Sequence, residues 1–151
     1  MIELEPLRRT AQDREFAYRL KRDALGPHVA PRWGWDEPYQ RGVHRERWER
    51  KTFYRIVRDG EAIGTLALDE AGDCLRFGEF YIRPELQGRG LGTEVLRLVL
   101  ARADAAGRPV RLEYLKWNPA GSLYRRHGFV MKGETEIHYL MERPARATAE
   151  A

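Results

Sequence analysis

The chain has 151 residues, of which 42% are hydrophobic and 33% are charged, and its formal net charge is +4. These values fit one globular domain, and no apolar run approaches the ~20 residues that span a bilayer, which excludes a membrane span. The single cysteine, Cys74, cannot form an internal disulfide, and the acidic N-terminus is unlike a signal peptide, so we expect a cytoplasmic protein.

Apolar periodicity and turn-forming residues predict eleven elements. In chain order they are a strand at 2–7, a helix at 10–26, a helix at 39–49, strands at 53–58, 62–68 and 74–82, a helix at 90–106, a strand at 110–114, a short helix at 122–127, and strands at 129–132 and 137–142. Thr10 and Asp13 have the capping-box spacing that starts a helix. Gly26 and Pro27 predict the end of that helix, with residues 28–38 irregular.

The order β-α-α-β-β-β-α-β-α-β-β predicts an α/β or α+β fold with one mixed sheet. Residues 1–143 are expected to form a single domain. The remaining segment, residues 144–151, is rich in Ala, Arg and Glu and is predicted to be a flexible tail.

Residues 41–58 hold seven basic residues and two acids, an excess of five positive charges. Such a segment can attract polyanions, including nucleic acid, or it can be a solvated helix face with pairs such as Glu46 and Arg50. We favour the second interpretation. We do not favour the alternative of a nucleic-acid-binding module, because no helix-turn-helix, zinc-finger or RNP-like pattern accompanies the charge.

The most informative stretch is the glycine-rich segment 87–93, which follows a predicted strand and opens a predicted helix. This arrangement turns backbone N–H groups toward an anion. The glycines at 88, 90 and 92 do not fit the dinucleotide-binding spacing, although Glu113 lies at a suitable distance for it, and no Walker sequence is present. The alternative is a turn that only caps the helix.

The pattern Gln87, Gly90 and Gly92 resembles the acyl-coenzyme A loop of the GNAT superfamily of N-acetyltransferases. The segment 118–129, from Asn118 to Gly128-Phe129, looks like the second signature of that family, with its small-residue position on Gly121 or Ser122. The segment 81–86 resembles the fourth strand of the family running into its loop. The resemblance covers residues 77–129, about a third of the chain.

The resemblance implies a mostly antiparallel central sheet flanked by helices, and transfer of an acetyl group from acetyl-coenzyme A to a primary amine of a small molecule or peptide, by direct attack on the thioester. It implies no metal, and it allows a homodimer. A non-catalytic sensor that binds coenzyme A is the alternative. The residues expected at the coenzyme are Phe80, Tyr81, Ile82, Gln87, Gly88, Arg89, Gly90, Leu91, Gly92, Thr93, Asn118, Ser122 and Arg125.

Amine attack on a thioester needs a base for the amine and an acid for the departing thiolate. Glu79, in the predicted fourth strand, is the first candidate for the base, with Glu113 in reserve. By resemblance, Tyr124 points its hydroxyl at the coenzyme sulfur and is the candidate acid. Glu79 could instead be a surface carboxylate, and Tyr124 a core residue.

An unusual segment of two indoles and two acids, Trp33, Trp35, Asp36 and Glu37, is the candidate for the acceptor side. Aromatic faces and carboxylates both attract ammonium groups, which fits a small amine or a peptide amino group. The alternative is a loop held to the core by its tryptophans, with its acids facing the basic helix that follows.

Overall fold

The computed structural model describes residues 1–146. Most of the predicted flexible tail therefore lies outside the described residues. The elements are β1 (Ile2–Pro6), α1 (Ala11–Trp33), α2 (Glu37–Arg50), β2 (Phe53–Arg58), β3 (Glu61–Ala71), β4 (Cys74–Ile82), the 3-10 turn η1 (Pro84–Leu86), α3 (Leu91–Ala106), β5 (Val110–Leu115), α4 (Gly121–Arg126), β6 (Val130–Glu134) and β7 (His138–Arg143). No helix in this described part is long and apolar enough to cross a membrane.

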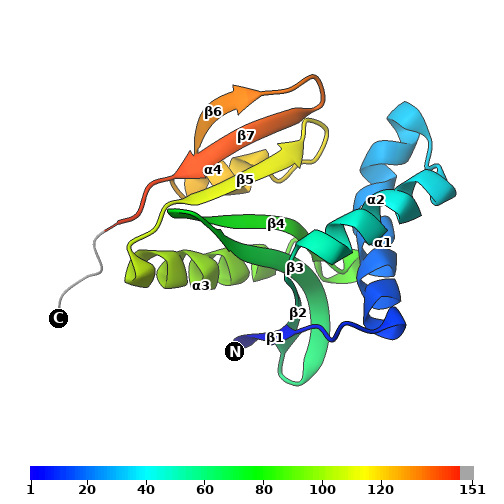
Figure 1. The fold of residues 1–151 in the computed structure, drawn as a ribbon, viewed down its shortest axis with the longest axis horizontal. Helices are drawn as coiled ribbons and strands as arrows, with labels where there is room; N and C mark the ends of the chain where they lie inside the picture. Colours follow the sequence, from blue (N-terminus) through cyan, green and yellow to red (C-terminus); the bar gives the residue numbers. More distant parts are fainter. Residues whose placement is uncertain (147–151) are drawn as a thin grey trace.

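One seven-stranded sheet, in the order β1-β2-β3-β4-β5-β7-β6, organises the chain (Figure 1). Neighbouring strands are antiparallel except β4 and β5, which are parallel. The connection between β4 and β5 contains α3. A parallel pair requires such a connection, because the chain must return to the end of the sheet where β4 begins before β5 can start. The predicted fold class, a mixed and mostly antiparallel sheet flanked by helices, is confirmed.

The first helix is longer than predicted. The prediction that Gly26 and Pro27 end it was wrong, because α1 continues to Trp33 with Pro27 and Pro31 inside it. Leu25 and Val29 are buried one turn apart, so continuing the helix removes further apolar surface from water. Burying one such side chain is worth about 1.5–3 kcal/mol, which offsets part of the ~3 kcal/mol that each of the two interior prolines costs.

The ends of the two N-terminal helices have identifiable caps. Thr10 accepts a hydrogen bond from the Asp13 amide at 3.1 Å, which confirms the predicted start of α1. Gly34 ends the helix with φ 71°, and its amide donates to the Ala30 carbonyl at 2.8 Å. Two residues later Asp36 caps α2, accepting from the Tyr39 amide at 3.1 Å. The predicted irregular segment 28–38 is therefore reduced to residues 34–36.

Two apolar clusters cover opposite faces of the sheet. Because neighbouring residues of a strand point to opposite faces, Leu66 joins the cluster with α3 and α4, whereas Ala67 joins the cluster with α1 and α2. The larger cluster includes Val95 of α3 and Tyr124 of α4. Helices on both faces leave the middle of the sheet reachable only where two strands separate.

Gly64 on β3 allows β4 to approach closely at Tyr81 and Ile82. A Cβ atom at Gly64 would overlap the Tyr81 carbonyl oxygen and would lie 3.2 Å from the Ile82 Cα atom. Both obstacles are tied to the backbone of β4, so they cannot move as a flexible side chain can. A side chain at this position therefore has to displace the strand.

We predict that Gly64→Ala lowers the free energy of unfolding by about 1–3 kcal/mol, because the added methyl group overpacks two paired strands. The measurement is urea denaturation. Gly42→Ala is the matched control: Gly42 lies in α2 with nothing within 4 Å of a built Cβ, so this change should raise stability by up to ~1 kcal/mol. Equal stability of Gly64→Ala and the unchanged chain would contradict the prediction.

Candidate active site

The sheet opens between β4 and β5. The two strands pair only at Leu75 with Val110 and at Arg76 with Arg111, near their N-terminal ends. Beyond these pairs the strands diverge, as Figure 1 shows. The edge of β4 from Phe77 to Ile82 is therefore not bonded to β5. Phe80, Tyr81 and Ile82, which the sequence placed along the coenzyme, all lie on this segment.

A β-bulge lies in the same segment of β4. Thr65 pairs with Tyr81 and Ala67 pairs with Gly78, so two residues of β4, Glu79 and Phe80, face one residue of β3. Glu79 has φ 48°, a left-handed conformation that is rare for a residue with a side chain. Strain of this kind persists only where the surroundings impose it, and it is concentrated at functional sites.

The glycine-rich segment forms the predicted loop. Gly88 and Gly90 have φ 77° and 78°, which permits the tight path into α3. Glu94 is the first residue of α3 whose amide bonds within the helix, to the Gly90 carbonyl at 3.2 Å. No side chain caps this end. The amides of residues 91–93 therefore remain available to an anion, with the partial positive charge of the helix start behind them.

The other residues predicted in this loop differ in exposure and in contacts. Arg89 is exposed beside the open amides, and Gln87 donates from Nε2 to the Ile82 carbonyl at 3.0 Å, which ties the loop to β4. Leu91 is buried in the core, whereas Thr93 and Gly92 are half-buried.

The segment after β5 places the second group of predicted residues. Asn118 accepts from the Ala120 amide at 3.0 Å, a turn that leads into α4. Gly121 is the position that needs a small residue, because a Cβ there would overlap the Tyr114 hydroxyl. Ser122 and Arg125 are exposed on α4.

Tyr124 is buried at 5% exposure, with its ring centroid 5.5 Å from that of Tyr114. Burial raises the pKa of the Tyr124 phenol, and the nearby Tyr114 phenol raises it further. Burial also raises the pKa of Tyr81 well above its usual value, with further contributions from Glu79 and Tyr124. Both phenols therefore stay protonated at neutral pH, and Glu79, Tyr81 and Tyr124 lie close enough to influence one another electrostatically.

Glu79 is buried within a group of cations. Its Oε2 atom accepts from Arg47 Nη1 at 3.0 Å and lies 3.8 Å from Lys51 Nζ. Burial raises the pKa of the Glu79 carboxyl, but Arg47, Lys21 and Lys51 together lower it by more, so it remains an anion at neutral pH. The surface-carboxylate alternative for Glu79 was wrong. The reserve candidate, Glu113, is exposed on β5.

Sequence reasoning missed the cations of this group. Arg47 is 32 positions from Glu79, so no local pattern connects them. Lys21 is buried at 3% exposure, and desolvation lowers its pKa. One signal was available: His44 and Trp48, four residues apart, mark the inward face of α2, and both are buried there. Arg47 lies beside that face.

Some basic side chains of residues 41–58 form ion pairs with acids of this chain. Glu46 and Arg50 form the predicted i,i+4 pair at 3.2 Å. Arg55 lies within 4 Å of Glu5 and of Asp13. These ion pairs agree with the favoured interpretation of this part of residues 41–58 as a solvated helix face with ion pairs.

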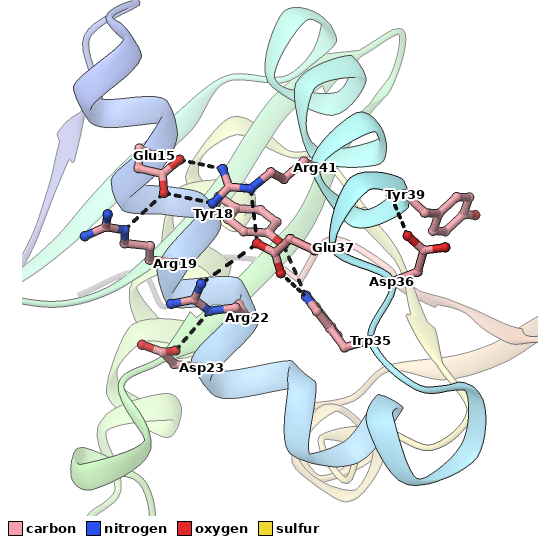
Figure 2. A network of polar contacts seen from close by, with 10 residues as sticks. All are labelled: Glu15, Tyr18, Arg19, Arg22, Asp23, Trp35, Asp36, Glu37, Tyr39 and Arg41. Carbon is pink, nitrogen blue, oxygen red and sulfur yellow. Dashed lines mark hydrogen bonds and ion pairs between the residues drawn. The ribbon is translucent and has the colours of Figure 1, made fainter.

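The candidate acceptor segment belongs to a network that joins α1 to α2 (Figure 2). Trp35 Nε1 donates to Glu37 Oε2 at 3.1 Å and to the Tyr18 hydroxyl at 3.2 Å. Glu37 also accepts from Arg41 Nε at 3.1 Å, and Arg41 reaches Glu15 with two further hydrogen bonds of 2.7 and 3.1 Å. Trp35 and Glu37 are thus already bonded within the fold.

The other two residues of that segment, Trp33 and Asp36, have different structural roles. Asp36 is the N-cap of α2, as described above. Trp33 is 50% exposed and meets Trp117, from the loop after β5, edge to face at 4.2 Å between centroids. Arg32 stacks over Trp117 at 5.3 Å. This contact connects the end of α1 to the β5 side of the divergence.

A groove of about 630 Å³ lies between the first half of α1 and the chain just after β4. None of the predicted site residues lines it. Its lining residues are Ala11, Gln12, Glu15, Phe16, Arg19, Leu20, Asp23, Arg83, Pro84 and Glu85.

Comparisons with known proteins agree on one family. A family model described as an acetyltransferase (GNAT) domain matches residues 49–131. The L-methionine sulfoximine/L-methionine sulfone acetyltransferase of Pseudomonas aeruginosa is 28% identical over 131 residues, 74% of this chain and 72% of that protein. The mycothiol acetyltransferase of Streptomyces coelicolor is 35% identical over 95 residues, 60% of this chain but only 30% of that longer protein.

Solved structures share the fold. The PaiA N-acetyltransferase from Thermoplasma acidophilum, solved in complex with coenzyme A, superposes with a TM-score of 0.74 over 95% of this chain and 99% of that one, at 20% identity. Because the family model covers more than half of the chain, and the sheet has the corresponding architecture, this protein belongs to the GNAT family of acetyltransferases.

Proposed function

We propose that the protein transfers an acetyl group from acetyl-coenzyme A to a primary amine of a small molecule or peptide, by direct attack of the amine on the thioester. The observation that carries the proposal is the combination of an uncapped, glycine-rich start of α3 with the unpaired edge of β4 beside it. The first can bind a pyrophosphate, and the second can bind the amide-bearing pantetheine arm as an added strand would bind.

The coenzyme is assigned to the opening between β4 and β5, on the side of the sheet that α3 and α4 cover. The amides of residues 88–93 would contact the pyrophosphate, with Arg89 and Arg125 near the phosphates. Phe80, Tyr81 and Ile82 would lie along the pantetheine. Asn118 would hold the arm from the side of β5, and Ser122 would do so from the start of α4. A backbone N–H near Tyr81 would stabilise the carbonyl oxygen as it gains negative charge.

Glu79 is proposed as the base. An alkyl ammonium group has a pKa of about 10.4, so it must lose a proton before it can attack. Glu79 Oε1 is free of protein partners within the described residues, and it can accept that proton directly or through a water molecule. Because its own pKa is lowered, Glu79 is ionised throughout the neutral range. It would therefore be ready to accept the ammonium proton, directly or through a water molecule, and to release it to solvent.

Tyr124 is proposed as the acid. When the amine nitrogen bonds to the carbonyl carbon, the carbon–sulfur bond breaks and the thiolate takes a proton from the Tyr124 hydroxyl. The new amide nitrogen gives up its extra proton to solvent, and the phenol is reprotonated from solvent. Its raised pKa keeps it a donor until the thiolate forms.

The acceptor entrance is assigned to the side of α1 and α2. Trp33 would offer an exposed indole face to an ammonium group. Trp35, Asp36 and Glu37 would hold the connection between α1 and α2, next to Trp33. The names of the relatives, which include an acetyltransferase for a methionine derivative and one for mycothiol, support a small acceptor.

The test is release of free thiol from acetyl-coenzyme A in the presence of single amines. The panel contains polyamines, aminoglycosides, free amino acids and peptides with a free N-terminus. The proposal predicts saturable release with one class of amine and a product heavier by one acetyl group. Binding of coenzyme A without release for any amine would favour the sensor alternative.

We predict that Glu79→Gln lowers the rate steeply below pH 8 and much less above pH 9, where more of the acceptor is already a free amine. The measurement is kcat/KM against pH for the variant and the unchanged chain. Glu113→Gln is the comparison. A loss that is equal at all pH values would remove Glu79 as the base, and a pH-dependent loss in Glu113→Gln alone would transfer the role to Glu113.

For Tyr124→Phe we predict a fall in kcat of about 10²–10⁴, the usual contribution of a positioned proton donor, with nearly unchanged affinity for coenzyme A. Single-turnover rates and calorimetry measure the two quantities. Tyr114→Phe removes a hydroxyl from the neighbouring buried ring and should leave kcat within a few-fold. Unchanged turnover in Tyr124→Phe would exclude it as the acid.

A further inference from the structure

We propose that the acceptor is a free amino acid or a close analogue, with its amine at Glu79 Oε1 and its carboxylate held by Arg47 and Lys51. This inference rests on the proposed acetyl transfer and names the class of amine. It predicts recognition of two opposite charges that lie a few bonds apart on one small molecule.

The first observation is an incompletely bonded carboxylate. The Glu79 side chain is only 6% exposed, and both of its cations contact the same oxygen, Oε2. Oε1 is buried and has no hydrogen-bond partner among the described residues. A buried carboxylate oxygen without a donor costs free energy, so a donor from outside the chain, a water molecule or an amine, would stabilise this atom. An amine supplies one.

The second observation is that Arg47 and Lys51 have N–H donors besides those directed at Glu79. Arg47 has five N–H donors, and only Nη1 is directed at Glu79. Its side chain is 26% exposed and that of Lys51 is 29% exposed, so both reach solvent. Lys51 Nζ lies 3.7 Å from the place where a Cβ on Gly78 would be, so the ammonium group sits over β4 just before the bulge.

The charge balance favours an acidic group on the acceptor. Two partly exposed cations, Arg47 and Lys51, face the buried Glu79, with the buried Lys21 also near Glu79 and the exposed Glu113 near Arg47, so three cations meet two carboxylates. A polyamine or a peptide N-terminus would add a further positive charge to this site. An amino acid brings its own carboxylate, which an arginine can bind with two parallel hydrogen bonds.

The distances favour a short acceptor. Arg47 and Lys51 lie 3.0 and 3.8 Å from one oxygen of the Glu79 carboxylate, and the unpartnered oxygen belongs to the same group. A carboxylate on the cations and an amine on Oε1 are therefore separated by no more than a few bonds. This spacing fits an α- or β-amino acid better than an amine far from its acid.

The experiment compares matched acceptors in the thiol-release assay at pH 9. For each of the twenty common amino acids, the free acid, the amide and the decarboxylated amine are assayed separately. We expect the free acid of the best series to exceed its amide at least tenfold in kcat/KM. Release that is equal or faster with the amide or the amine would overturn this inference and leave the proposed function standing.

Two variants then test the residues. Arg47→Gln and Lys51→Gln should each reduce the ratio of acid to amide in kcat/KM at least fivefold, and Arg45→Gln, an exposed position on the same helix, should not change it. The ratio is taken within one preparation, so a partly unfolded variant does not distort it. An unchanged ratio in Arg47→Gln would contradict the assignment. Absence of release with every acceptor would defeat the proposed function, and this inference with it.

Discussion

The separation of β4 from β5 is the constraint on which the site depends. A parallel pair that kept its register would close the middle of the sheet, and both faces are already covered by helices. The bulge at Glu79 turns β4 away, and the close approach of Gly64 to Tyr81 fixes where the strand goes afterwards. The unpaired edge of β4 proposed for the coenzyme, the candidate base and the proposed entrance for an acceptor are therefore consequences of one departure from regular pairing.

The buried charges explain why this departure is stable. A carboxylate cannot be buried alone, and removing one partner from a buried ion pair typically costs ~3–5 kcal/mol. Arg47 and Lys51, from the end of α2, supply the partners, and the Trp35, Glu37 and Arg41 network holds α2 against α1. The polar residues of the N-terminal half thus position the cations. The part of the chain with the least resemblance to the family determines what the candidate base touches.

The sequence predicted regular elements well where local chemistry determines them. The strands at 53–58 and 74–82 have the predicted bounds, and Thr10 caps α1 as expected. The end of α1 was mispredicted, because the helix continues through both prolines with Val29 buried, and burial is not visible locally. The glycine loop was visible because Gln87, Gly90 and Gly92 form a short pattern at fixed spacing within one segment. The pairing of Arg47 with Glu79 was not visible, because it joins elements 32 positions apart.

The central claim is that the uncapped start of α3 and the unpaired edge of β4 together bind an acyl-coenzyme A. Isothermal titration calorimetry with acetyl-coenzyme A tests it most directly, since it requires neither the acceptor nor turnover. The account predicts saturable heat with one site per chain, and a rise in the melting temperature that grows with ligand concentration. No heat and no shift at millimolar acetyl-coenzyme A would contradict it.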